Sequence, residues 1–225
     1  TPSQNWGSPS IGNLDGDNFS DVVISSQNGH IYVFGSSETV QSGVLLDFDS
    51  GALITATPAL GDVDGDGLDE IVFAQYGGDK HLYVINGDGT NADGFPYNLD
   101  EKVLRGVALA DFDGNGKMDI VVGTDDESIH LIGDNGTLIW TKQLDGDIKV
   151  APTVLELNTG DKIILAGSRD RNFYALDSDG TIRFTVETNN FITTEASVLD
   201  IEGVGPVIFF ASSNKLYAVE TDGDI

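Results

Sequence analysis

Three nine-residue segments of the chain carry oxygen-bearing side chains at their first, third, fifth and ninth positions. The segments are residues 13–21, 62–70 and 111–119, which read NLDGDNFSD, DVDGDGLDE and DFDGNGKMD. Ca²⁺ takes six to eight oxygen ligands at about 2.3–2.6 Å, and a tight acidic loop can supply them. The pattern predicts three calcium sites, whose side-chain ligands are Asn13, Asp15, Asp17 and Asp21; Asp62, Asp64, Asp66 and Glu70; and Asp111, Asp113, Asn115 and Asp119.

The residues between these ligands favour a tight wrap around an ion. Position four is glycine in all three segments, and position six is glycine in two of them and Asn18 in the first. Glycine adopts left-handed backbone conformations without steric cost, and asparagine tolerates them better than most residues. We also expect the backbone carbonyl at position seven to bind the ion, which adds Phe19, Leu68 and Lys117 to the predicted ligands.

The alternative to metal binding is an acidic turn that holds no ion. Three features favour the metal: the pattern occurs three times, each copy ends in an acid, and each is followed at once by an apolar run, VVIS, IVFA or IVVG. An EF-hand loop instead needs a bidentate Glu at its twelfth position. The acid at position nine and the strand-like run after it therefore exclude an EF-hand.

The segments belong to a longer repeat. Asp15, Asp64 and Asp113 follow one another at a spacing of 49 residues, and Asn158 and Glu202 take the same slot after 45 and 44 more. A period of 20–50 residues is typical of solenoids, propellers and repeat arrays. We predict five units in one domain of residues 1–225, with limits near 7–55, 56–104, 105–149, 150–193 and 194–225. The last two units lack the spaced acids, so we expect no metal there.

Each unit reads as four short β-strands. The third runs are HIYVFG, HLYVIN, SIHLIG, NFYALD and KLYAVE, and in the last four units an Asn-Gly or Asp-Gly turn follows. Such dipeptides between β-prone runs are strong hairpin signals. Four antiparallel strands in a unit of this length predict an all-β fold, a β-propeller of five four-stranded blades or a five-blade segment of a larger propeller.

The two ends of the chain leave that choice open. Residue 225 falls just after the turn of the fifth unit, so a fourth strand for that unit is not in the sequence. Residues 1–6 could form a minimal closing strand, although they are short for it. We favour the alternative, in which the chain is a piece of a longer propeller.

The acidic loops and their repeats resemble FG-GAP repeats of integrin-α-type propellers and their bacterial relatives. The resemblance covers roughly residues 8–145, although the Phe-Gly pair occurs only once, at Phe34-Gly35, and no Gly-Ala-Pro is present. It implies that the three loops bind Ca²⁺. From Gly136 onward the sequence is more similar to quinoprotein-type propeller repeats, as in GTLIWTKQL and SSNKLYAVETDG. Both families imply a propeller.

Composition limits the possible partners and compartments. The net charge is −26, from 37 acidic and 11 basic residues, which argues against binding to nucleic acid or anionic lipid because both require Lys and Arg. There is no cysteine and no 18-residue apolar run, so we predict no disulfide and no membrane-spanning helix. Weak calcium loops fill at the millimolar levels found outside the cytoplasm, which favours an extracellular, cell-surface or periplasmic location.

The sequence contains no evident catalytic constellation. No serine lies in G-x-S-x-G, and no glycine-rich loop opens a helix. The first hypothesis is therefore an interaction module of a secreted or cell-surface protein, with structural Ca²⁺ and an unknown protein or glycan partner, as in adhesion. A polysaccharide lyase or another carbohydrate-active propeller enzyme is the alternative, but few basic residues are available for its groove. A quinoprotein-like assembly scaffold is the second alternative. Further blades or domains of the same protein are also possible partners.

Overall fold

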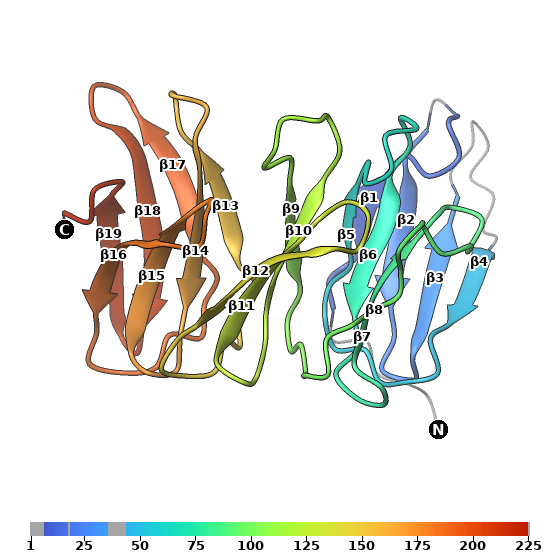
Figure 1. The fold of residues 1–225 in the computed structure, drawn as a ribbon, viewed down its shortest axis with the longest axis horizontal. Coiled ribbons are helices and arrows are strands. Elements are labelled where there is room, and N and C mark those ends of the chain that lie inside the picture. The colour runs from blue at the N-terminus through green and yellow to red at the C-terminus, as the bar shows by residue number, and fades with distance from the viewer. Residues whose placement is uncertain (1–6, 18, 36–43, 225) are drawn as a thin grey trace.

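The computed structural model describes residues 7–17, 19–35 and 44–224, and every element in this part of the chain is a β-strand (Figure 1). Consecutive strands pair antiparallel into four sheets of four strands and a fifth of three. The first sheet has strands β1 (Ser10–Gly12), β2 (Asp21–Ser25), β3 (His30–Phe34) and β4 (Val44–Asp49). The second has β5 (Ala59–Gly61), β6 (Glu70–Ala74), β7 (His81–Ile85) and β8 (Tyr97–Asn98).

The third, fourth and fifth sheets continue the same order along the chain. They are β9 (Val107–Ala110), β10 (Asp119–Gly123), β11 (Ser128–Ile132) and β12 (Leu138–Gln143); β13 (Thr153–Glu156), β14 (Lys162–Gly167), β15 (Asn172–Asp177) and β16 (Ile182–Glu187); and β17 (Ser197–Ile201), β18 (Gly205–Ser212) and β19 (Lys215–Glu220). The predicted all-β, propeller-like architecture is confirmed. The unit limits stay a prediction, because the sheets fix strand ends and not the ends of units.

The second strands of the second and third sheets are buried throughout because neighbouring sheets cover both of their faces. All five residues of β6 and of β10 are buried. On β2, by contrast, buried and half-buried residues alternate. The fourth strands β4 and β12 are mostly exposed. Side chains alternate between the two faces of a strand, so a run buried throughout indicates a sheet enclosed on both sides.

The hydrophobic core consists of four clusters, one between each pair of neighbouring sheets. Ile31 and Val33 of the first sheet meet Ile71 and Phe73 of the second. The other clusters join the second sheet to the third, the third to the fourth, and the fourth to the fifth. Among the described residues, these core clusters therefore link each sheet only to its neighbours in the chain, as in other repeat architectures.

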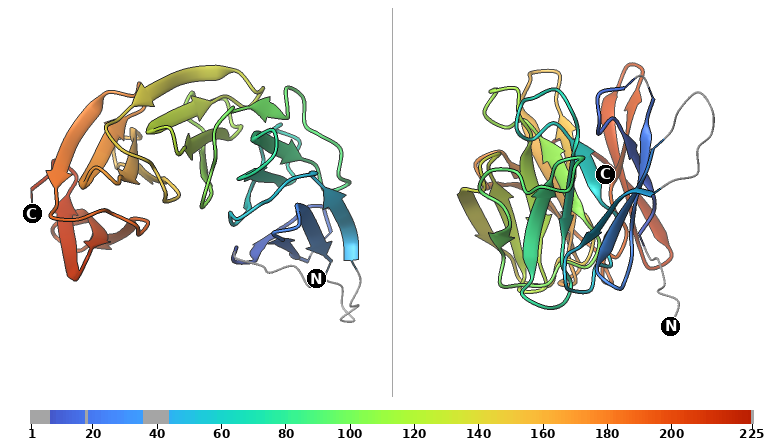
Figure 2. Two further views of the ribbon diagram at one scale, coloured as in Figure 1. Left: turned by 90° about the horizontal axis from the view of Figure 1, so that it is seen from below. Right: turned by 90° about the vertical axis from the view of Figure 1, so that its right-hand side faces the viewer.

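The five sheets are arranged as an arc around an open side (Figure 2). The loops β1–β2, β5–β6 and β9–β10, which hold the acidic segments, lie at the same end of the sheets, the top in Figure 1. The repeat thus brings all predicted metal loops to one face. Two predictions fall outside the described residues, namely the closing strand of residues 1–6 and the turn position of Asn18.

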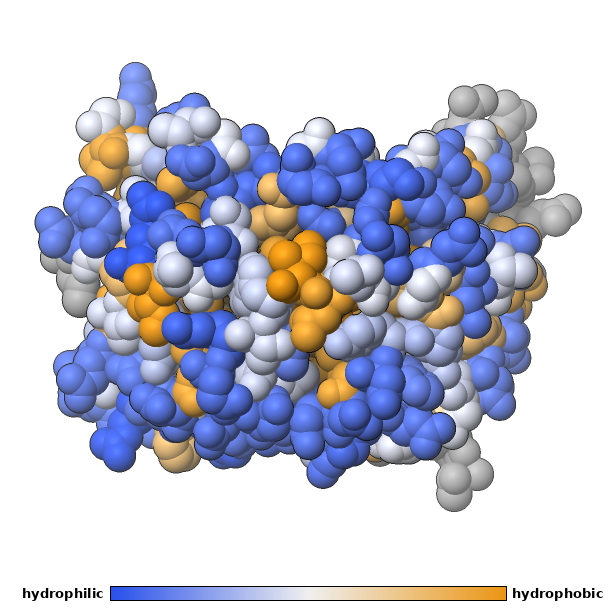
Figure 3. Space-filling model, in the orientation of Figure 1, coloured by the Kyte–Doolittle hydropathy of each residue, from blue (hydrophilic) through white to orange (hydrophobic). Residues whose placement is uncertain are grey.

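The surface seen in Figure 3 is mostly hydrophilic, in keeping with the net charge of −26. The apolar group near the middle of that view lies over β12, whose exposed apolar residues are Leu138 and Ile139. Within the described ranges no helix is long and apolar enough to cross a lipid bilayer.

Candidate metal centres

The three acidic loops share one internal hydrogen-bond pattern. The side chain at position one accepts the N–H of position four at 3.0, 2.6 and 2.7 Å in the first, second and third loop. The side chain at position three accepts the N–H of position five at 3.0 Å in every loop. The side chain at position five accepts the N–H of position seven at 2.6, 2.8 and 2.7 Å. The sequence repeat is therefore also a repeat of loop geometry.

The turn at position four requires glycine. Gly16, Gly65 and Gly114 have φ angles of 77°, 82° and 79°, a left-handed conformation that costs other residues about 1–2 kcal/mol. The N–H of this residue donates to the side chain of position one in each loop.

The ninth-position acid connects each loop to the sheet beneath it. Asp21, Glu70 and Asp119 are the first residues of β2, β6 and β10, and they are only 1%, 2% and 2% exposed. Each accepts the N–H of position two of its own loop, at 3.1, 2.7 and 2.9 Å from the nitrogens of Leu14, Val63 and Phe112. The ninth-position carboxylate, held at the start of a buried strand, therefore ties the end of each loop to its beginning.

Carboxylate oxygens converge in the second and third loops. Atoms of Asp62, Asp64 and Glu70 lie within 4.8 Å of one another, and so do atoms of Asp111, Asp113 and Asp119. The predicted ligand Asp66 is not one of the three converging acids of its loop, and its Oδ1 accepts the N–H of Leu68. The first loop has Asn13 at position one, so its first and ninth positions offer an amide oxygen and a carboxylate.

The electrostatic environment of Glu70 and Asp119 in the two acidic clusters favours a bound cation. Burial raises the pKa of Glu70 to about 7, and the carboxylates of Asp64 and Asp66 add to the rise, while the N–H groups of Val63 and Asp64 oppose it. Burial also raises the pKa of Asp119, with the nearby Asp113 and Asp134 contributing. A buried carboxylate among other carboxylates is stabilised in its charged form by a cation.

Direct contacts join the loops of neighbouring sheets. The N–H of Asn13 donates to Asp69 Oδ2 at 2.9 Å, and the N–H of Asp69 donates to the Asn13 carbonyl at 2.9 Å. In the same way the N–H of Met118 donates to the Asp62 carbonyl at 3.0 Å. Position eight of one loop therefore holds position one of the preceding loop. The nine-residue pattern does not reveal this, because position eight is Ser20, Asp69 and Met118 in the three copies.

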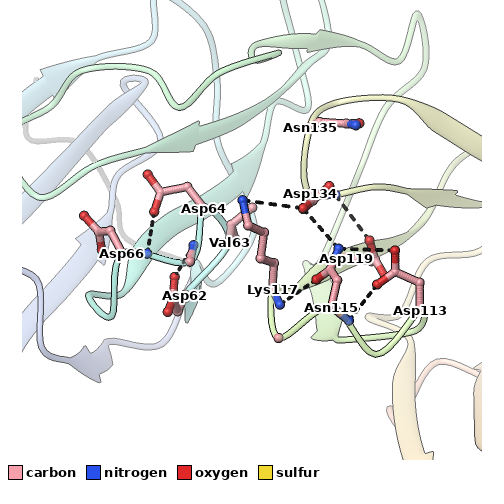
Figure 4. Close-up of polar contacts among 12 residues, drawn as sticks. Asp62, Val63, Asp64, Asp66, Asp113, Asn115, Lys117, Asp119, Asp134 and Asn135 are labelled. Carbon is pink, nitrogen blue, oxygen red and sulfur yellow. Dashed lines mark hydrogen bonds and ion pairs between the residues drawn. The ribbon is translucent and has the colours of Figure 1, made fainter.

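Asp134 is a further acid at the third loop. Its N–H donates to Asp119 Oδ1 at 3.2 Å, and its Oδ2 lies 3.3 Å from Asn115 Nδ2 and 3.9 Å from Lys117 Nζ (Figure 4). The sequence indicates only a hairpin turn at residues 134–136, because Asp134 comes from the turn after β11 and lies outside the nine-residue spacing.

The residues present fit a hard cation. All converging donors are oxygens, the type that Ca²⁺ and Mg²⁺ prefer, and the second loop can offer four carboxylates. Phe19, Leu68 and Lys117 lie in the loops as expected, where their N–H groups are hydrogen-bonded. Their carbonyls stay predicted ligands. The arrangement can bind a divalent cation and hold the loop in one shape.

Comparison with known proteins supports this assignment for the middle of the chain. The family model of the FG-GAP-like repeat matches residues 62–122, which contain the second and third loops. No curated protein sequence is significantly similar to the chain.

Several solved propeller structures are similar in fold. A structure described as BBS1N in complex with ARL6DN has 12% sequence identity and a TM-score of 0.69, and the match covers 97% of this chain and 61% of that one. BamB from Moraxella catarrhalis has 16% identity and a TM-score of 0.66, with 100% and 65% covered. Quinohemoprotein alcohol dehydrogenase from Comamonas testosteroni has 11% identity and a TM-score of 0.69, with 98% and 42% covered.

At such identities the likeness shows the fold alone, and the chain spans less than two thirds of each of these proteins. The earlier resemblance to both FG-GAP and quinoprotein-type propellers is confirmed at that level. Residues 62–122 carry an FG-GAP-like repeat, within an all-β chain whose sheets are arranged as in β-propellers.

Proposed function

We propose that this chain is a calcium-stabilised propeller module that recognises a protein or glycan partner outside the cytoplasm. The observation that carries the metal part is the convergence of three carboxylates in each of two loops that share one hydrogen-bond pattern. The first loop has the same internal pattern, although with Asn13 at position one. Asn13, Asp15, Asp17 and Asp21 would hold the third ion.

The bound ions would have a structural role. Each loop connects the first two strands of its sheet, and neighbouring loops bond to each other through Asp69 and Met118. An ion would neutralise the clustered carboxylates and hold these contacts in register. We assign recognition to the module, with the ions holding the loops that shape its top face.

Charge and fold type support the proposed extracellular location and partner class. Loops of this kind need calcium at levels found outside the cytoplasm. With a net charge of −26, the module would repel nucleic acid and anionic membranes. Propeller loops are frequent binding surfaces because a rigid scaffold positions them. A neutral or basic glycan or protein is the partner class that suits this charge.

Calorimetric titration of the metal-free chain with Ca²⁺ is expected to give three ions per chain. Asp64→Ala should lower this number by one, because it removes a converging carboxylate of the second loop. Asp161→Ala is the matched control, since this exposed acid lies in the corresponding loop of the fourth unit, which lacks the spaced acids. Mg²⁺ should bind more weakly because it demands near-octahedral geometry at a shorter distance. Fewer than two Ca²⁺ ions per chain would refute the assignment.

A glycan array probed with the chain tests the recognition part. We expect binding to a limited set of neutral or basic glycans in calcium, and at least tenfold weaker signals after chelation, because the loops that shape the top face lose their order. The chain with Asp64→Ala and Asp113→Ala serves as a calcium-deficient control. Equal signals with and without calcium would argue against a calcium-organised binding face, and hydrolysis of an arrayed glycan would favour the enzyme alternative.

A further inference from the structure

The first sheet has one face turned away from the second sheet. Position by position, this outward face matches the face of the second sheet that is buried against the first. Strand registers define the correspondence: Val22 pairs with Phe34 as Ile71 pairs with Ile85, and Ser10 pairs with Val23 as Ala59 pairs with Val72. The outward residues of the first sheet are Ile11, Val22, Ile24, Tyr32 and Phe34, and their counterparts in the second are Leu60, Ile71, Phe73, Tyr83 and Ile85. Both sets are apolar or aromatic throughout.

Burial separates the two faces. In the second sheet Ile71, Phe73 and Ile85 are 0%, 1% and 0% exposed, because the first sheet packs on them. In the first sheet Ile11 is 70% exposed and Phe34 is 36% exposed. Val22 and Ile24 are half-buried, so positions that are core in the second sheet are partly open to solvent in the first.

The opposite end of the arc shows the same relation. Val198 pairs with Ile208 as Val154 pairs with Ile164, which aligns the fifth sheet with the fourth. The fifth sheet presents Leu199, Phe209, Leu216 and Ala218 where the fourth has Leu155, Leu165, Phe173 and Ala175. Leu165 and Phe173 are 1% and 0% exposed beneath the fifth sheet, whereas Leu199 and Leu216 are 58% and 73% exposed.

We propose that these two faces are docking surfaces for further propeller blades carried in cis, each a four-stranded antiparallel sheet with an apolar face. The proposal continues the four interfaces already present between neighbouring sheets. The two faces end the arc on either side of its opening (Figure 2). Exposed apolar patches are typical of interaction sites, and these patches occupy positions that form interfaces elsewhere in the arc.

The comparisons and the charge favour this occupant over a second copy. The matches cover 61% and 65% of the BBS1N and BamB chains, so more than a third of each of those chains lies outside the matched part. A second copy would bring another net charge of −26, and self-repulsion opposes such an assembly.

A fused blade tests the proposal directly. In the test chain residues 150–193 are copied in front of Gly7 and replace residues 1–6. This unit is chosen because its Leu165 and Phe173 already cover the equivalent slots of the fifth sheet. We expect amide exchange in peptides of β2 and β3 to slow at least tenfold relative to the parent chain, and the added blade to resist limited proteolysis.

The matched control is the same fusion with Leu165→Asp in the added copy only, which should leave β2 and β3 exchange at the parent rate. Proteolytic trimming of the unmodified fusion back to the parent chain would overturn the proposal. It would mean that the outward face of the first sheet does not bind a blade whose apolar residues match it.

Sedimentation of the parent chain is expected to show a monomer. A dimer that Ile11→Lys abolishes would instead assign the face to a second copy. None of these results depends on calcium, so they are separate from the function proposed above.

Discussion

Replacing Glu70 by alanine is expected to lower the free energy of unfolding in calcium by at least about 3 kcal/mol. Loss of an ion that binds only the folded state costs about 2.7 kcal/mol when Ca²⁺ is a hundredfold above its Kd. Glu70 also accepts the N–H groups of Val63 at 2.7 Å and Asp64 at 3.2 Å. Alanine leaves these donors without their acceptor, and a buried unsatisfied donor costs about 1–3 kcal/mol.

Urea unfolding with calcium and with chelator separates the two contributions. In chelator the loss should shrink to the hydrogen-bond part. Glu70→Gln is the matched control, because it keeps an acceptor oxygen for Val63 but removes the charge, so it should lose mainly the calcium-dependent part. If wild type and Glu70→Ala respond equally to calcium, the second loop does not hold a stabilising ion. Unfolding unaffected by either substitution would mean that packing alone maintains the loop.

Replacing Phe73 by alanine is expected to destabilise the protein by about 3–5 kcal/mol, the usual cost of removing a buried aromatic side chain. Phe73 is 1% exposed in the cluster between the first and second sheets. Its ring stacks on Tyr83 at a centroid distance of 5.1 Å and meets the edge of Phe48 at 6.1 Å. The cavity would open between two sheets, and it would weaken the contact that holds the first sheet.

Phe34→Ala is the matched control, because this aromatic residue of the first sheet is 36% exposed. Its loss should stay near the 0.5 kcal/mol typical of surface substitutions. Thermal or urea unfolding of both variants provides the comparison. Because the core clusters link each sheet only to its neighbours, hydrogen exchange should quicken in β2, β3, β6 and β7 before it does in the fifth sheet. Equal losses for the two variants would contradict the assignment of Phe73 to the core.

The sequence by itself determined the features that depend on short-range spacing. Alternating and continuous apolar runs predicted strands such as β2 and β6, because the two-residue period of a strand is a local property. The repeat spacing of Asp15, Asp64 and Asp113 predicted the successive sheets, since equal units stack in chain order. Spaced acids and position-four glycines such as Gly65 predicted the loop geometry, because its hydrogen bonds run between residues two to seven positions apart.

Only the tertiary structure decided what depends on contacts between distant residues. It placed Asp134 beside Asn115 and joined Asp69 to Asn13, contacts across 19 and 56 residues that no local pattern encodes. It buried Glu70 at the start of β6, which raises the pKa of that carboxyl group. It also left Ile11 exposed at a position where the second sheet has Leu60 packed against the core. Residues of the same type in the same register can thus be core or surface, because burial is set by the neighbouring sheet and not by the strand that carries them.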